Sequence, residues 1–130
     1  MDPVAPHFEL TEESPDARTH VINVRGEIHV STAQLFSERL TGAIATGKTA
    51  FVLDLTGVEY IDSTGLSVLL NGLRRVTRQR GRLALVCANP TVLRLFEITR
   101  LDSTFDIFAE RAPALAHAQS GADGSSGGAP

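Results

Sequence analysis

Features that build disulfide-linked or membrane-embedded proteins are missing from this sequence. There is no tryptophan, and the single cysteine, Cys87, has no second cysteine with which to form an internal disulfide. No apolar run approaches the roughly 18 residues that a membrane-spanning helix requires. Residues 1–6 lack the basic patch and following apolar stretch of a secretory signal. We therefore expect a cytoplasmic protein with no membrane association.

An excess of positive charge is also lacking. The formal net charge is -3, from 12 Lys and Arg against 15 Asp and Glu. A protein that binds the phosphate backbone of nucleic acids normally concentrates Lys and Arg on one surface, so direct nucleic-acid binding is not expected. One basic cluster exists, and the usual role of such arginines is to form the solvated face of an amphipathic helix. Its members are Arg74, Arg75, Arg78, Arg80 and Arg82.

Signals for metal binding and catalysis are weak. The four histidines are scattered without the spacing of metal ligands, and Cys87 is best interpreted as a small buried hydrophobic residue. No serine has the flanking sequence of a nucleophile elbow. The sequence thus predicts no metal, no cofactor and no enzymatic activity.

Short apolar blocks of strand-like character recur along the chain. Two of them flank the turn-rich residues 13–16, which predicts a β-hairpin whose second strand ends at Gly26. The runs 51–55 and 83–87 are nearly continuously apolar, as is typical of strands buried on both faces of a parallel sheet. The predicted strands are 8–10, 20–24, 51–55, 83–87 and 105–107.

Helical spacing of apolar residues separates these strands. The first predicted helix has its N-cap at Ser31 or Thr32 and stops at Gly47. The second carries apolar positions from Leu66 to Val76, and the third opens at Asn89-Pro90. A last, alanine-rich helix is predicted over 109–118, interrupted near Pro113.

Alternating strands and helices with short connections predict a single α/β domain. We expect a mostly parallel mixed sheet of about five strands packed with about four helices. The domain is expected to occupy residues 1–112, with a C-terminal extension over 113–130. That extension is predicted to be a short helix followed from Ser120 by a disordered tail rich in Gly, Ser and Ala.

Residues 42–49, Gly-Ala-Ile-Ala-Thr-Gly-Lys-Thr, match the letters of a phosphate-binding P-loop. Such a loop must leave a strand and open a helix, so that backbone N–H groups face the phosphates. Here the match closes a predicted helix and leads into a strand, which would free carbonyl groups instead. We therefore interpret Gly47 as a helix stop and Lys48 as a favourable charge beside it.

The most informative motif is Ile-Asp-Ser-Thr-Gly-Leu at 61–66, between a buried strand and an amphipathic helix. With Gly-Glu-Ile at 26–28, the strand at 51–55 and Asn-Pro-Thr-Val-Leu-Arg-Leu-Phe at 89–96, it resembles the STAS domain of bacterial anti-sigma factor antagonists. The resemblance spans residues 8–108 in the same order. In that family the serine after the aspartate is phosphorylated by the anti-sigma factor, which implies Ser63 as the phosphorylation site and Thr64 as the second choice.

A hydroxyl at a strand-to-helix junction suits that role, because it is exposed and lies near the positive end of a helix dipole. The alternative interpretation is that Asp62, Ser63 and Thr64 simply cap the helix, a common use of these residues. Phosphorylation would add about -1.5 to -2 charge beside the Asp62 carboxylate. We expect this charge to block docking rather than to refold the domain.

The resemblance implies partner switching. The unphosphorylated protein would bind an anti-sigma factor that has serine kinase activity, releasing a sigma factor; phosphorylation would end the binding, and a PP2C-type phosphatase would reset it. The oligomeric state is expected to be a monomer or a weak dimer. The expected contact residues are Gly26, Glu27, His29, Ser31, Thr32, Asp62, Ser63, Thr64, Gly65 and Leu66.

One position departs from the family pattern, in which an aspartate commonly follows the Gly-Glu-Leu segment where this chain has His29. Because imidazole titrates near neutrality, His29 suggests partner binding that depends on pH. Two other functions stay open. The domain could be an accessory or scaffold subunit of a stress-sensing or transporter complex, or it could sense a nucleotide or another small ligand.

Overall fold

The computed structural model describes residues 8–122, and the predictions made for residues 1–7 and 123–130 lie outside them. The strands are β1 (Phe8–Asp16), β2 (Thr19–Ile28), β3 (Ala50–Ile61), β4 (Arg82–Val86) and β5 (Asp106–Phe108). The helices are α1 (Val30–Ala45), α2 (Ser63–Arg78), α3 (Pro90–Ile98) and α4 (Arg111–Ala122), with a short 3-10 helix, η1 (Leu101–Ser103).

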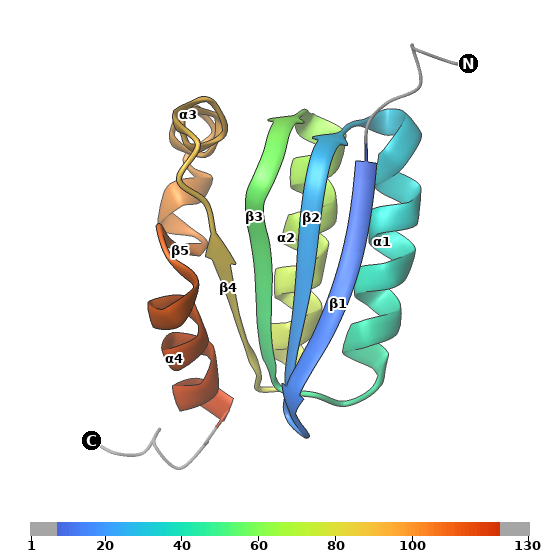
Figure 1. The fold of residues 1–130 in the computed structure, drawn as a ribbon, viewed down its shortest axis with the longest axis vertical. Coiled ribbons are helices and arrows are strands. Elements are labelled where there is room, and N and C mark those ends of the chain that lie inside the picture. The colour runs from blue at the N-terminus through green and yellow to red at the C-terminus, as the bar shows by residue number, and fades with distance from the viewer. Residues whose placement is uncertain (1–7, 123–130) are drawn as a thin grey trace.

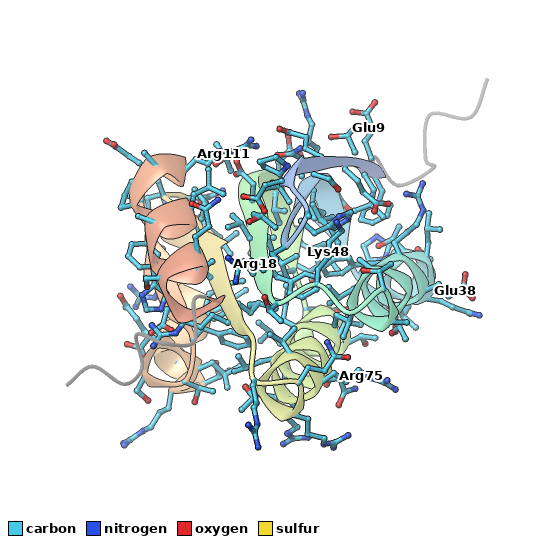
Figure 2. The ribbon with its side chains drawn as sticks, turned by 90° about the horizontal axis from the view of Figure 1, so that it is seen from below. Glu9, Arg18, Glu38, Lys48, Arg75 and Arg111 are labelled. Atoms are coloured by element: carbon cyan, nitrogen blue, oxygen red, sulfur yellow. The ribbon has the colours of Figure 1, made fainter. Side chains whose placement is uncertain are left out.

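The strands form one sheet in the order β1-β2-β3-β4-β5, in which β1 is antiparallel to β2 and the other pairs are parallel. The predicted mixed α/β fold is confirmed. Each parallel crossover steps to the next strand in the same direction, so right-handed connections place α1, α2 and α3 on one face. Helix α4 lies on the opposite face, where Figure 2 shows it across the sheet from α1 and α2.

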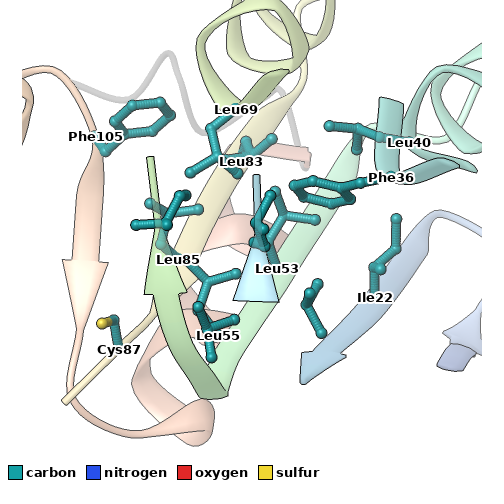
Figure 3. Close-up of a cluster of buried hydrophobic side chains, with 14 of the residues drawn as sticks. Ile22, Phe36, Leu40, Leu53, Leu55, Leu69, Leu83, Leu85, Cys87 and Phe105 are labelled. Atoms are coloured by element: carbon teal, nitrogen blue, oxygen red, sulfur yellow. The ribbon is translucent and has the colours of Figure 1, made fainter. Parts of the chain in front are cut away.

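Two apolar layers hold the sheet because side chains of a strand alternate between its faces. Toward α1, α2 and α3, the strands present large residues such as Ile22, Leu53 and Leu85, which pack with Phe36 and Leu69 (Figure 3). The layer toward α4 is built of smaller residues, listed here: Val21, Ala50, Val52, Ala84, Val86, Ala114 and Ala118. The small side chains allow α4 to lie close to the strands.

The predicted β-hairpin is present, but its strands are longer than predicted. β1 continues to Asp16, with a register irregularity between Glu13 and Asp16. Pro15 is tolerated there because β1 is an edge strand and the irregularity lacks regular ladder hydrogen bonds. Gly26 does not end β2, which continues to Ile28; its φ of +97° lies beside a register shift toward β3. The glycine therefore bends the strand instead of terminating it.

The helix ends also correct several predictions. The N-cap of α1 is His29, not Ser31 or Thr32, and Pro113 does not interrupt α4, because it lies in the first turn, where a missing N–H costs nothing. The predicted tail from Ser120 begins within α4, which continues to Ala122. The predicted division of the chain at 112/113 stays a prediction.

Two strands also differ slightly from the prediction: β4 and β5 are each displaced by one residue from their predicted positions.

The P-loop-like residues lie as the helix-stop interpretation predicts. Residues 42–45 end α1, Thr46 is its C-cap, and Gly47 follows with a left-handed φ of +89°. The Lys48 ammonium donates to the carbonyl of Ala17 at 3.2 Å, and β3 then begins at Ala50. The segment thus closes a helix and enters a strand, opposite to the geometry that exposes N–H groups to a phosphate.

Gly65 allows the first turn of α2 to approach the sheet. A Cβ atom at this position would lie 2.7 Å from both the Ile28 and the Ile61 side chains. Gly42, on the exposed side of α1, has no atom within 4 Å of the corresponding position. A side chain is therefore excluded by packing at Gly65 but not at Gly42.

A polar network attaches α4 to the other face of the sheet. The Arg111 guanidinium donates to the Asp54 carboxylate at 3.1 and 3.2 Å, to the Glu13 carboxylate at 3.1 and 3.2 Å, and to the Asn23 amide oxygen. Burial acts to raise the pKa of Asp54, but hydrogen bonds from Thr56 and Arg111 outweigh it and hold that pKa below its ordinary value. Three strands and one helix are thereby linked through one side chain.

Gly65→Ala is expected to lower the free energy of unfolding by about 1–3 kcal/mol, because the added methyl group must displace Ile28 and Ile61. Gly42→Ala is the matched control and should raise it by about 0.5–1 kcal/mol, since alanine restricts the unfolded chain. Urea denaturation measures both. Equal effects of the two substitutions would contradict the close approach at Gly65.

Arg111→Ala is expected to lower the free energy of unfolding by about 1–3 kcal/mol, because Asp54 would be left half-buried without its cation. Arg94→Ala removes an exposed arginine from α3 and should change the stability by less than about 0.5 kcal/mol. Chemical denaturation of both variants tests the network. Indistinguishable variants would show that Arg111 contributes no more than an ordinary surface residue.

The depressed pKa of Asp54 also predicts a pH dependence. A carboxyl group whose pKa is lower in the folded state stabilises the fold above its unfolded pKa, and this contribution is lost as the pH falls through the folded pKa. The difference in urea midpoint between the wild type and Asp54→Asn should therefore narrow below about pH 4. A difference that stays constant from pH 7 to strongly acidic pH would contradict this account.

Candidate functional site

Two helices begin side by side at one edge of the sheet. The parallel strands β2 and β3 pair Ile28 with Ile61 at their carboxyl ends, and each strand leads directly into a helix. The backbone N–H of Asp62 donates to the Ile28 carbonyl at 3.1 Å. The N-termini of α1 and α2 therefore lie together at the upper end of the sheet in Figure 1. We call this end, residues 27–32 and 59–66, the rim.

Asp62 caps α2. Its backbone is extended, and its Oδ1 atom accepts the Gly65 N–H at 3.1 Å while its carbonyl accepts the Leu66 N–H at 3.0 Å. Ser63 is the first helical residue, and both Ser63 and Thr64 are exposed. Among the described residues, neither hydroxyl makes a hydrogen bond. The capping interpretation is thus correct for Asp62, and the two hydroxyl groups stay free for another role.

His29 caps α1 in a reciprocal arrangement. Its Nδ1 atom accepts from the Ser31 backbone N–H at 3.3 Å and lies 2.9 Å from the Ser31 hydroxyl, while the Thr32 hydroxyl accepts the His29 N–H at 3.0 Å. An accepting Nδ1 places the imidazole proton on Nε2, which lies 3.4 Å from a Glu27 carboxylate oxygen. Histidine therefore performs here the capping task that aspartate performs on α2.

Two exposed apolar side chains flank these caps. Val30 is 74% exposed and Tyr60 is 47% exposed, and the Tyr60 ring lies beside the His29 ring with centroids 6.3 Å apart. Exposed large apolar residues close to a polar rim are typical of a docking surface. Neither residue is among the contact residues predicted from the sequence. Tyr60 lies one position before the end of β3, in the half of the strand that alternates between buried and exposed residues.

The structure brings most of the predicted contact residues together, but not all are accessible. Ser31, Ser63 and Thr64 are exposed, while Glu27, His29 and Asp62 are partly buried. The others are buried: Gly26, Thr32, Gly65 and Leu66. Gly26 lies in β2 just before the rim, paired with Phe8 on one side and Val58 on the other. The four buried residues can support the surface but offer it little area, and the role of all ten in partner binding stays a prediction.

The rim is anionic. It carries the carboxylates of Glu27, Glu59 and Asp62, and the chain has no Lys or Arg at residues 26–38 or 57–73. A phosphate on Ser63 would therefore find no lysine or arginine side chain within the segments that build the rim. The backbone N–H groups of the first turn of α2 would be the positive groups nearest to it.

The residues that the structure describes include no candidate metal site, and their one cysteine is buried. Within residues 8–122, no three His, Cys, Asp or Glu side chains are placed to hold a metal ion. Cys87 is buried, and this burial raises the pKa of its thiol, as befits an inert core residue. No helix between Phe8 and Ala122 is long and apolar enough to cross a membrane.

Comparison with known proteins agrees with this architecture. The STAS domain family matches residues 10–114. The anti-sigma-B factor antagonist of Bacillus subtilis is 36% identical over 89 residues, which cover 68% of this chain and 81% of that protein.

Solved structures show the same fold. An anti-sigma factor antagonist from Mycobacterium paratuberculosis superposes with a TM-score of 0.80 at 27% identity, covering 87% of this chain and 95% of that one. SpoIIAA of Bacillus superposes with TM-scores of 0.73 in its unphosphorylated form and 0.66 in its phosphorylated form, at 23% identity. The unphosphorylated match covers 88% of this chain and 97% of that chain, and the phosphorylated match covers 85% and 98%. With its sheet order, its paired helix N-termini and a family match over residues 10–114, this chain belongs to the STAS domain family.

Proposed function

We propose that this protein is an anti-sigma factor antagonist whose rim binds a kinase-type anti-sigma factor until Ser63 is phosphorylated. The observation that carries the proposal is the position of Ser63, exposed at the start of α2 and next to the start of α1. The name of the Bacillus subtilis relative supports the same function. Binding to the anti-sigma factor releases a sigma factor to direct transcription, so the protein acts as a regulator and not as an enzyme.

The chemistry of the switch is a phosphoryl transfer. The anti-sigma factor acts as a serine kinase: the Ser63 hydroxyl oxygen forms a bond to the γ-phosphorus of ATP, ADP leaves, and the hydroxyl proton is released. A PP2C-type phosphatase hydrolyses the ester to inorganic phosphate and restores the hydroxyl. Both partners and the cytoplasmic location belong to the proposal, and Thr64 is the second choice of site.

Electrostatics give the switch its direction. The phosphate adds about -1.5 to -2 charge at pH 7, next to the cap Asp62 and among the other rim carboxylates. Within the free domain, attraction to the start of α2 and repulsion by Asp62 are each worth ~1 kcal/mol or less at an exposed site, so they largely cancel. An uncompensated like-charge contact in an interface costs several kcal/mol, and ~4 kcal/mol is about three decades in affinity.

The exposed apolar residues of the rim would attract the partner, and a phosphate would prevent the close contact that this attraction needs. Val30 and Tyr60 are exposed at the rim and would be covered when the partner docks. Their burial requires the rim to approach the partner closely, and an added phosphate on Ser63 would prevent that approach. The apolar contact residues and the proposed phosphorylation site therefore lie on the same surface, the rim.

Ser63→Ala is expected to bind the anti-sigma kinase constitutively, even with ATP present, while Ser63→Glu should bind at least about tenfold more weakly, as even a partial like-charge cost of ~1.4 kcal/mol predicts. Calorimetry with the purified kinase measures both affinities. Thr64→Glu is the matched control for charge placed one residue further along α2.

Equal binding by Ser63→Ala and Ser63→Glu would refute the switch and favour a stable accessory-subunit role. Equal loss of affinity in Ser63→Glu and Thr64→Glu would show that any added charge at the start of α2 prevents docking. In that case Ser63 would have no special place in the interface. Far-UV circular dichroism of the variants confirms that each one is folded.

A further inference from the structure

A second surface lies on the C-terminal half of α2. An apolar groove of about 540 Å³ runs between this helix and the η1 segment. Its apolar floor is formed by Leu70, Leu73 and Leu101, and its edges by Thr77 and Thr104 together with two arginines, Arg74 and Arg78. The groove thus combines aliphatic surface with positive charge along one side.

The arginines form a ridge with depressions on both sides. Toward α1, a polar depression of about 280 Å³ is lined by Ser37, Thr41, Asn71, Arg74, Arg75 and Arg78. Figure 2 shows Arg75 pointing outward from the end of α2. Within residues 8–122, none of Arg74, Arg75 and Arg78 forms an ion pair with a carboxylate. We call these three residues and the apolar groove beside them the arginine ridge.

Stability of the helix does not account for the arginine ridge. Arg75 and Arg78 lie in the last turn, where positive charge favours the helix dipole. Arg74 lies before that turn, and like charges at positions i and i+4, such as Arg74 and Arg78, destabilise a helix slightly. The dipole also gives no reason for an apolar groove beside the charges. An anionic occupant would relieve the repulsion and cover the leucines.

The arginine ridge is separate from the rim. Leu70 and Thr77 lie seven and fourteen residues beyond Ser63, which at the rise of an α-helix is about 10 and 21 Å along the axis. A partner at the far end of α2 therefore need not touch Ser63. The two surfaces can be occupied independently.

We propose that the arginine ridge docks an acidic amphipathic helix of a protein partner. Leucine side chains of such a helix would enter the groove over Leu70, Leu73 and Leu101, while its carboxylates would pair with the planar guanidinium groups, which bind carboxylates in a bidentate manner. A groove with an apolar floor favours a row of inserted side chains over the flat surface of a bilayer. A nucleic-acid backbone could pair with the arginines but would leave the leucines of the groove uncovered.

The test uses a synthetic amphipathic helix of Leu, Ala and Glu, and a matched peptide with Gln in place of every Glu. Fluorescence anisotropy with the full chain should show the Glu peptide binding roughly tenfold or more tightly than the Gln peptide, since hydrogen bonds to charged groups carry the difference. Arg74→Gln/Arg78→Gln and Thr77→Glu should each abolish that preference. Arg25→Gln/Arg94→Gln removes two charges elsewhere and should leave it unchanged, as should Thr77→Gln.

Ser63→Glu should also leave peptide binding unchanged, which separates this proposal from the function proposed for the rim. Loss of peptide binding in Ser63→Glu would overturn the independence of the two surfaces. Equal affinity for the Glu and Gln peptides, or no effect of Arg74→Gln/Arg78→Gln, would overturn the acidic-helix proposal. Binding to phosphatidylglycerol vesicles that needs Arg74 and Arg78, without peptide binding, would overturn it in favour of a membrane.

Discussion

The hydrogen bond from the Asp62 N–H to the Ile28 carbonyl, at 3.1 Å, joins the N-cap of α2 to the last residue of β2, and the rim depends on this junction. It fixes where β2 and β3 stop relative to each other and hence where α1 and α2 begin. Gly65 completes the junction, because the absence of a side chain lets α2 start directly over Ile28 and Ile61. A serine on a flexible loop would meet a kinase equally well, but it would not be held beside the surface that a partner must cover.

The negative charge of the rim determines how a phosphate on Ser63 would affect binding. Both helices present backbone N–H groups to the same edge of the sheet. Some of these N–H groups already donate to a capping side chain, Asp62 on α2 and His29 on α1. Carboxylates but no Lys or Arg accompany them in these segments. A phosphate on Ser63 would thus be tolerated by the free domain and opposed at an interface. The arginine ridge at the other end of α2 has the opposite charge, so one helix would serve two partners of different chemistry.

The sequence predicted the fold better than it predicted local detail, and Ser63 as the phosphorylation site stays a prediction. Continuous apolar runs such as 51–55 and the 3.6-residue spacing after Leu66 depend on burial alone, and they identified the sheet and α2 correctly. Sequence reasoning failed where tertiary pairing overrides local preference: strand pairing continues β2 through Gly26, and contact with Ser31 makes His29 the cap. Val30 and Tyr60 were missed because apolar spacing does not distinguish a buried residue from an exposed one at the end of an element.

Phosphosite mapping by mass spectrometry tests the central claim most directly. The protein would be isolated from its native cells with and without stress, beside a strain that carries Ser63→Ala. The account predicts phosphate on Ser63 whose occupancy changes with stress, and none on the chain in the variant strain. Persistent absence of phosphate from Ser63 in both conditions, with the protein still held in a complex, would contradict it.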